Sequence, residues 1–211
     1  MRLLSFLGKT LRQPPSEARL ASHQLLVRAG CVRGLEVGQF AYLPLGCRAL
    51  HRLNILIRSE LSGLGAQEVE LPHSPDVERS RTLVRIVGRE VDSYRQLPVL
   101  LFQFASQSSL QPRGPAGLFG AGESPSIEIH AFDGAGLEAA GQQVDSAVAA
   151  LLDACAVPVV QVQAGDEGRH VVFPHPSGDE EIARCPDCGH AAERSWATTS
   201  WPDPPEDAEL P

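Results

Sequence analysis

The sequence predicts an α+β fold, in which a mainly antiparallel sheet is flanked by helices. Segments with helical spacing of apolar residues alternate with short segments in which apolar and polar residues alternate, as they do in strands. Two of the predicted strands, residues 98–105 and 127–132, are joined by a loop without a helical pattern. Parallel neighbours need a longer crossover connection, so these two strands are expected to form an antiparallel hairpin.

The chain is expected to begin with an unstructured arm, residues 1–15, that ends in two prolines. Ser16 is the predicted cap of a first helix, and Gly30 follows its last residue. Two short strands are expected next within residues 35–44, around Gly38. The side of the first helix that we expect to be buried carries Leu20, Leu25, Leu26 and Ala29.

A long amphipathic helix is predicted for residues 47–64, where apolar residues recur at helical spacing, and Gly65 ends it. Residues 66–72 then alternate as a strand with one buried face. A further helix is expected over residues 77–96. Its apolar side is formed by Leu83, Val84, Val87, Val91 and Tyr94.

The second half begins with a long loop, residues 106–125, that is rich in Ser, Gly and Pro. Beyond the predicted hairpin, we expect an alanine-rich helix over residues 137–156 and strands at 159–163 and 170–173. The last segment, 196–211, is acidic and rich in proline, which is typical of a disordered tail.

Composition narrows the class of protein. The 211 residues are long enough to bury a core, and 43% of them are hydrophobic. The net charge of -8 argues against DNA or broad nucleic-acid binding, although it leaves room for a local basic groove. The odd count of five cysteines without a secretion signal favours a reducing, cytoplasmic location. No apolar run approaches the roughly 18 residues that a membrane span needs.

One pair of cysteines has the spacing of a metal knuckle. Cys185 and Cys188 are separated by two residues, so their thiolates can share one zinc ion. A structural zinc site needs four ligands, and the nearest further candidates are His190 and His175 because a second such pair is absent. The alternative is an ordinary pair of thiols without a metal.

Three stretches carry a family resemblance. The first, Ala18–Pro72, contains ASHQLLVRAG, FAYLPLG and AQEVELP; the second, Ser93–Pro98, reads SYRQLP; the third, Gly178–Glu193, reads GDEEIARCPDCGHAAE. In this order and spacing they resemble bacterial prolyl-tRNA synthetases, which are class II aminoacyl-tRNA synthetases. The resemblance implies a partial, truncated class II synthetase core.

The same resemblance implies a division of the chain. Residues 16–177 are similar to part of the catalytic core, and 178–195 to the entrance of the family's inserted editing domain. The helix at 47–64 and the strand that ends at Pro72 match the first class II motif, which forms the dimer interface in the family.

The positions that handle substrates in the family differ here. An arginine and a glutamate of the second motif correspond to Ser109 and Gln111, so Arg113 is the nearest cation for a nucleotide phosphate, or else a solvated loop arginine. The substrate-holding threonine-x-glutamate loop corresponds to Glu78–Arg81, which we expect to be a solvated helical face. His170 replaces a substrate contact and is expected on an edge strand or at the surface. A third motif and an anticodon-binding domain have no counterpart.

These departures predict a non-catalytic relative that acts as a homodimer, as a partner of a synthetase subunit, or by binding tRNA. No catalytic residue is assigned, and no cofactor is expected in this case. A reduced or split proline–tRNA ligase, using ATP and Mg²⁺, is the first alternative. A zinc-knuckle interaction module is the second. His23, on the first helix, is expected to be a packed histidine.

Overall fold

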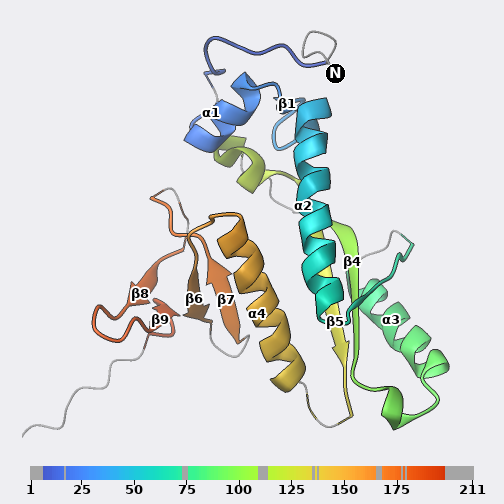
Figure 1. The fold of residues 1–211 in the computed structure, drawn as a ribbon. Coiled ribbons are helices and arrows are strands. Elements are labelled where there is room, and N and C mark those ends of the chain that lie inside the picture. The colour runs from blue at the N-terminus through green and yellow to red at the C-terminus, as the bar shows by residue number, and fades with distance from the viewer. Residues whose placement is uncertain are drawn as a thin grey trace, which may run out of the picture. The chain divides into compact units, whose positions relative to one another are not determined.

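The fold is described from a computed structural model (Figure 1). It covers residues 7–16, 18–72, 76–108, 114–134, 136, 138–164, 168–176, 178 and 180–197. The chain divides into two compact units, residues 1–151 and 152–211. The division that the sequence predicts, into residues 1–15, 16–177, 178–195 and 196–211, stays a prediction.

The first unit begins with a helix and a small hairpin. Helix α1 (Ala21–Arg28) is followed by strands β1 (Val32–Gly34) and β2 (Phe40–Tyr42), which pair antiparallel. Gly38 lies in the turn between them with a φ of 74°, a conformation that glycine adopts without steric cost. The hairpin around this glycine and the position of β2 are therefore confirmed, whereas β1 lies before the predicted range of 35–44.

Helix α1 begins later than the sequence predicts. Leu20 is the residue at its N-cap, and no side chain caps it, so Ser16 is not the cap. The predicted buried side is also wrong: Leu25 is 60% exposed, whereas His23 and Val27 are buried. These two residues are one helical turn apart, and the imidazole of His23 packs edge-on against the Phe40 ring, 5.3 Å between centroids. The side of α1 that carries His23 and Val27 is therefore the buried side, and His23 contacts the hairpin.

Helix α2 (Pro44–Gly63) matches the predicted long helix but starts three residues earlier. A proline at the first helical position suits this start, because its missing N–H would have no intrahelical partner there. At the other end, Gly65 has a φ of 79° and donates its N–H to the Ser62 carbonyl at 2.9 Å. The predicted glycine stop is confirmed.

The central sheet of the first unit has the order β3–β4–β5. Strands β4 (Val99–Ser108) and β5 (Glu123–Phe132) form the predicted antiparallel hairpin and pair over ten residues each. Strand β3 (Gln67–Glu68) pairs parallel with β4 and is shorter than predicted. Within the predicted loop, a 3-10 segment, η3 (Gly114–Gly120), precedes β5.

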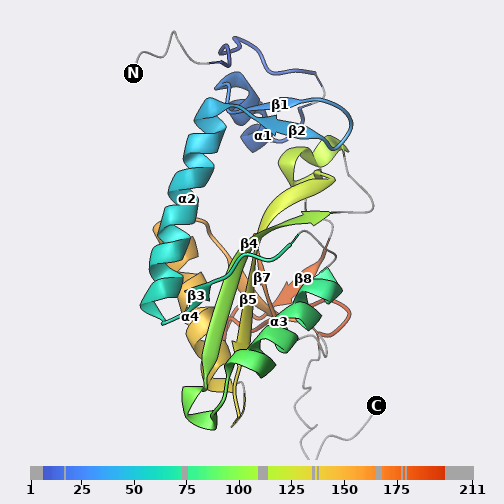
Figure 2. The ribbon, with the colours of Figure 1, turned by 90° about the vertical axis from the view of Figure 1, so that its right-hand side faces the viewer.

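The two faces of this hairpin are covered by different helices (Figure 2). Helices α2 and α4 (Glu138–Ala154) cover one face and form the hydrophobic core with it. Helix α3 (Asp76–Glu90) lies against the other face, where Leu83 is completely buried. The predicted helix over 77–96 ends at residue 90, and a separate turn, η2 (Tyr94–Gln96), follows. The core residues are Ile57, Leu61, Ala66, Leu100, Phe102 and Ala140.

The second unit contains a four-stranded sheet in the order β7–β6–β9–β8. Strands β6 (Val160–Gln163) and β7 (Arg169–Val172) match predicted strands, and His170 lies on an edge strand as expected. The hairpin of β8 (Ile182–Arg184) and β9 (Ala191–Glu193) was not predicted. Most strand pairs in the protein are antiparallel, so the predicted α+β class is confirmed. Among the described residues, no helix has the length and apolar character that crossing a membrane requires.

Candidate functional site

The face of the β4–β5 hairpin that meets α3 carries polar side chains. Gln103 on β4 lies directly opposite Glu128 on β5, and His130 is two residues further along β5. Side chains two residues apart in a strand share a face, and residues directly opposite in an antiparallel pair do so too. All three side chains therefore belong to the face opposite the hydrophobic core.

Arg79 reaches this face from helix α3. Its Nε donates to both carboxylate oxygens of Glu128 at 3.1 Å each, and its Nη2 contacts Oε1 of the same group. Gln103 donates from Nε2 to the other side of the carboxylate, Oε2, at 2.6 Å. Arg79 is 7% exposed, so the solvated surface expected for this stretch is wrong at this position. Burying a guanidinium costs free energy, and the paired carboxylate of Glu128 offsets that cost.

The resulting group of Arg79, Gln103, Glu128 and His130, here called the Arg79 cluster, keeps its carboxylate ionised. The hydrogen bond from Arg79 is the main cause that lowers the pKa of Glu128, and it outweighs the opposite effect of burial. His130 Nε2 lies 3.8 Å from Glu128 Oε2, and within the part of the chain that the structure describes it is buried without a hydrogen-bond partner. A carboxylate with a lowered pKa and two bound donors is a poor general base.

The sequence contains a signal for this cluster that the predictions did not use. In the strand 127–132, Ile127 and Ile129 alternate with Glu128 and His130, so one face of the strand is polar. A polar face on a hairpin that is covered on both sides requires a partner for its charge. Nothing in the sequence pattern identifies Arg79 as that partner, because α3 carries several arginines.

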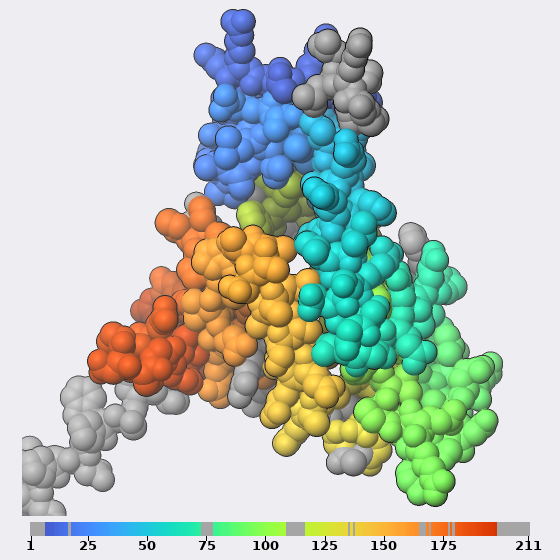
Figure 3. Space-filling view, in the orientation of Figure 1, coloured from blue at the N-terminus to red at the C-terminus, as the bar shows by residue number. Residues whose placement is uncertain are grey.

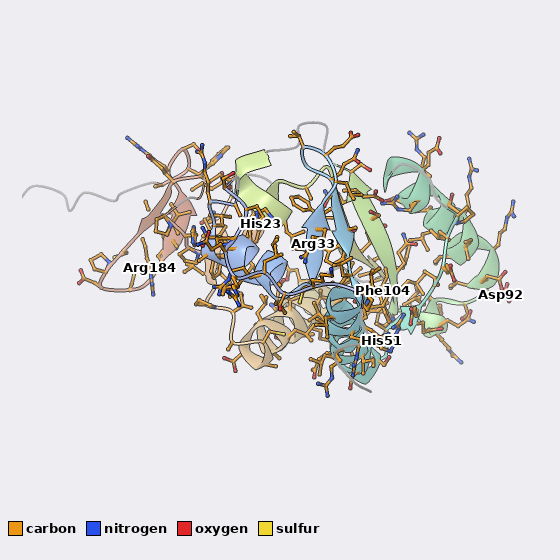
Figure 4. The ribbon with its side chains drawn as sticks, turned by 90° about the horizontal axis from the view of Figure 1, so that it is seen from above. His23, Arg33, His51, Asp92, Phe104 and Arg184 are labelled. Atoms are coloured by element: carbon orange, nitrogen blue, oxygen red, sulfur yellow. The ribbon has the colours of Figure 1, made fainter. Side chains whose placement is uncertain are left out.

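The opposite face of the hairpin borders a hollow. A cavity of about 410 Å³ lies between α1, α2, η3 and the hairpin, and its lining is mostly apolar, with Phe104 and Ile127 contributed by the two strands. Two lining residues, His23 and Ser126, each hold a buried polar atom that has no hydrogen-bond partner among the described residues. His23 is packed as expected, and its ring lies against Gly117. In Figure 4 His23 and Phe104 mark the α1 and β4 sides of this region.

The predicted nucleotide contact cannot be placed. Arg113, together with Ser109 and Gln111, lies outside the described residues.

The predicted cysteine pair lies in the turn between β8 and β9. Cys185 donates its backbone N–H to the His190 carbonyl at 2.8 Å, and Gly189 donates to the Cys185 carbonyl at 3.1 Å. The backbone N–H groups of Cys188 and Asp187, in that order, lower the pKa of the Cys185 thiol. Across the part of the chain that the structure describes, no three His, Cys, Asp or Glu side chains gather closely enough to hold a metal ion. Zinc binding by Cys185 and Cys188, with His190 or His175 as further ligands, stays a prediction.

Comparison with known proteins gives a consistent result. No protein-family model matches the chain. It is 31% identical to proline--tRNA ligase of Salinispora tropica, an alignment that covers 97% of this chain and 41% of that protein. It is 32% identical to the ligase of Desulfitobacterium hafniense, with 91% and 40% covered. The crystal structure of prolyl-tRNA synthetase from Cryptosporidium parvum, complexed with L-proline and AMP, matches 81% of the chain with a TM-score of 0.57 at 16% identity, covering 42% of that chain.

The fold and these similarities define a class II aminoacyl-tRNA synthetase-like protein. Within that class, the chain is a relative of the bacterial prolyl-tRNA synthetases. It spans about two fifths of the length of the curated relatives that it matches.

Proposed function

We propose that this chain is a non-catalytic prolyl-tRNA synthetase-like protein that acts in the cytoplasm by self-association, or by binding a synthetase subunit or tRNA. The observation that carries the proposal is the pairing of buried Arg79 with Glu128. The resemblance places the substrate-holding loop of the family at Glu78–Arg81, and here that stretch is part of a helix whose arginine is bound to the sheet.

The Arg79 cluster supports the proposal through its chemistry. A substrate that entered between α3 and the hairpin would have to replace the hydrogen bonds from Arg79 and Gln103 to the Glu128 carboxylate. Leaving a buried carboxylate or guanidinium without its partner costs several kcal/mol, on the order of 3–5 kcal/mol. The cluster therefore opposes binding of amino acid or nucleotide on this face.

The sequence between residues 108 and 114 supports the proposal independently. Serine and glutamine stand at 109 and 111, where the resemblance predicts an arginine and a glutamate. Neither side chain carries the positive charge that stabilises a transferring phosphoryl group. Each such loss is expected to lower the adenylation rate by orders of magnitude.

A binding role is supported by apolar side chains that the chain leaves exposed. Leu35 and Val37 in the β1–β2 turn are 68% and 76% exposed, and Phe119 in η3 is 76% exposed. Strand β5 pairs on one side only among the described residues. Exposed apolar groups and unpaired strand edges are features that a partner commonly covers.

The test is proline-dependent exchange of pyrophosphate into ATP, with a bacterial prolyl-tRNA synthetase assayed in parallel. We expect no exchange above background from the purified chain with ATP, Mg²⁺ and proline. Exchange that disappears in an Arg113→Ala variant would overturn the proposal, because it would assign adenylation to this chain. Exchange that the variant leaves unchanged, but that stays with the chain through a further purification step, would overturn the proposal as well.

A second arm of the test addresses the split-ligase alternative. The chain is mixed with a separately purified polypeptide that carries the third class II motif. Exchange that appears only in the mixture would replace the proposed binding role with that of one half of an enzyme. Partner binding is measured by isolating the tagged chain and identifying bound synthetase and tRNA.

A further inference from the structure

The cavity between α1, α2, η3 and the β4–β5 hairpin has a volume of about 410 Å³, a size typical of sites for small organic molecules. All of its described lining residues belong to the first unit. Gly117 lets η3 approach α1, because a Cβ at this position would lie 2.8 Å from the imidazole ring of His23. The next two residues, Leu118 and Phe119, line the cavity. The shape of the cavity therefore depends on a close contact that glycine permits.

The chemistry of the lining disfavours charged ligands. No lysine, arginine or acidic side chain is among the described residues that line the cavity. Most of the lining side chains are aliphatic or aromatic, such as Leu53, Ile57 and Phe104. Moving an ionised group from water into such surroundings without a counter-charge is costly. A nucleotide or a free amino acid is therefore a poor fit, and an uncharged, largely apolar molecule is favoured.

Four lining side chains hold hydrogen-bonding groups that the fold leaves unused. His23 Nδ1 and Ser126 Oγ are buried and have no hydrogen-bond partner among the described residues. Tyr42 and Asn54 are partly buried, and neither side chain bonds to another residue that the structure describes. Burial raises the pKa of the Tyr42 hydroxyl, because the charged phenolate would lose contact with water. Unpaired polar groups in a mostly apolar wall are typical of a site in which the ligand supplies their partners.

The mouth of the cavity is surrounded by large apolar side chains that are exposed. Leu53 of α2, Phe119 of η3 and Ile127 of β5 are 39%, 76% and 38% exposed, and all three line the cavity. They come from three different elements. A molecule that enters the cavity would remove apolar surface of all three from water, which favours binding.

We propose that this cavity binds an uncharged, mostly aromatic or aliphatic small molecule, whose hydrogen-bonding group is held by Tyr42 and Asn54. Burial against the apolar walls supplies most of the affinity, and the two polar side chains fix the orientation. The site lies on the face of the hairpin opposite the Arg79 cluster and does not rest on the proposed lack of catalysis. Binding to the cavity and pyrophosphate exchange are separate measurements, so either proposal can fail alone.

Two related fluorescent probes test the charge preference of the site in the full chain. N-phenylnaphthylamine is uncharged, largely apolar and carries one N–H donor, and anilinonaphthalene sulfonate has the same rings with a sulfonate added. We expect saturable fluorescence enhancement of the neutral probe, with one molecule bound per chain. The sulfonate should bind at least about tenfold more weakly. Near-UV circular dichroism verifies that the protein is natively packed.

Substitutions in α2 locate the bound probe. Leu53→Trp fills the cavity from its mouth and should weaken binding of the neutral probe at least about tenfold. Ile55→Trp is the matched control, because Ile55 is 51% exposed on the same helix and does not line the cavity; it should leave binding unchanged. Asn54→Leu keeps the size of the side chain but removes the amide, and it should weaken binding by about three- to tenfold.

Several results would overturn the proposal. Absence of saturable binding by folded wild-type protein, or equal affinity for the two probes, would do so without any variant. Equal effects of the two tryptophans would place the probe elsewhere, and unchanged binding by Asn54→Leu would remove the assigned hydrogen bond. Binding that disappears as the protein concentration rises would also contradict the proposal, because a second copy of the chain would then cover the cavity.

Discussion

At the scale of single residues, Glu128 is held by donors from two different elements, Arg79 on α3 and Gln103 on β4. The side chains of the ion pair are 9% and 21% exposed. A charge at this depth is tolerated only with its partner, so removing one partner is far more harmful than removing both. The Arg79 cluster therefore fixes α3 on the hairpin and makes that position specific.

The first prediction concerns the two members of this pair. Arg79→Met should lower the free energy of unfolding by about 3–5 kcal/mol, because it leaves the Glu128 carboxylate buried without its main donor. The double variant Arg79→Met/Glu128→Leu should recover part of this loss. Urea unfolding of the wild type, both single variants and the double variant gives the coupling energy.

An exposed ion pair in the same unit is the matched control. Arg58 and Glu68 are 2.8 Å apart, and both side chains are 41% exposed. Glu68→Gln should change stability only slightly, because water screens this pair. A loss in Arg79→Met no larger than in Glu68→Gln would contradict the buried pairing.

A second prediction follows from the pKa of Glu128, which Arg79 holds below its ordinary value of 4.5. A carboxyl group with a lowered pKa in the folded state stabilises the protein fully above the unfolded-state pKa and loses that contribution as the pH falls through the folded-state pKa. The stability difference between the wild type and Glu128→Gln should therefore be largest near neutral pH and shrink below about pH 4.5. Urea midpoints across this range measure it; a difference that grows on acidification would exclude the ionised pair with Arg79.

At the scale of elements, the sequence predicts those helices and strands in which apolar residues recur periodically over many positions. Helix α2 and the β4–β5 hairpin were expected because apolar spacing runs through many residues. Strands β8 and β9 have three residues each, too few to show a period, and only their pairing makes them strands. The predicted start of α1 is wrong because Ser16 is a good capping residue by type, whereas the helix begins after Leu20, which makes no side-chain capping hydrogen bond.

Two glycines of α2 give a prediction at this scale. A Cβ on Gly46 would lie 2.3 Å from the backbone oxygen of Cys31, whereas Gly63 has open space around that position. Gly46→Ala should destabilise the protein by about 1–3 kcal/mol, since backbone cannot move aside as a flexible side chain does. Gly63→Ala, in the same helix, should leave stability unchanged or raise it by at most about 1 kcal/mol. Thermal unfolding of both variants is the measurement, and equal effects would show that α2 does not approach Cys31 this closely.

At the scale of the whole molecule, part of the apolar side of α2 is left uncovered by the other described elements. Ile57 and Leu61 are buried in the core, but Leu53 and Leu56, on the side that periodicity predicts to be buried, are 39% and 47% exposed. Figure 3 shows the surface of this helix uncovered along much of its length. The sequence could predict the apolar stripe because periodicity reports it. It could not show how much of the stripe one chain buries, because this depends on where β4, β5 and α4 end. The uncovered part supports the proposed self-association, and it lies on the helix that the family resemblance matches to a dimer interface.

The last prediction tests that packing directly. Leu56→Glu should weaken self-association by about 10–100-fold, because it removes the burial of one leucine, worth about 1.5–3 kcal/mol, and places a charge in the contact. Ser59→Glu adds the same charge to an exposed polar position of the same helix and should change association much less. Sedimentation equilibrium measures the association, and circular dichroism verifies that both variants fold. Wild-type protein that stays monomeric under these conditions, or equal weakening by both variants, would remove α2 as a dimer surface.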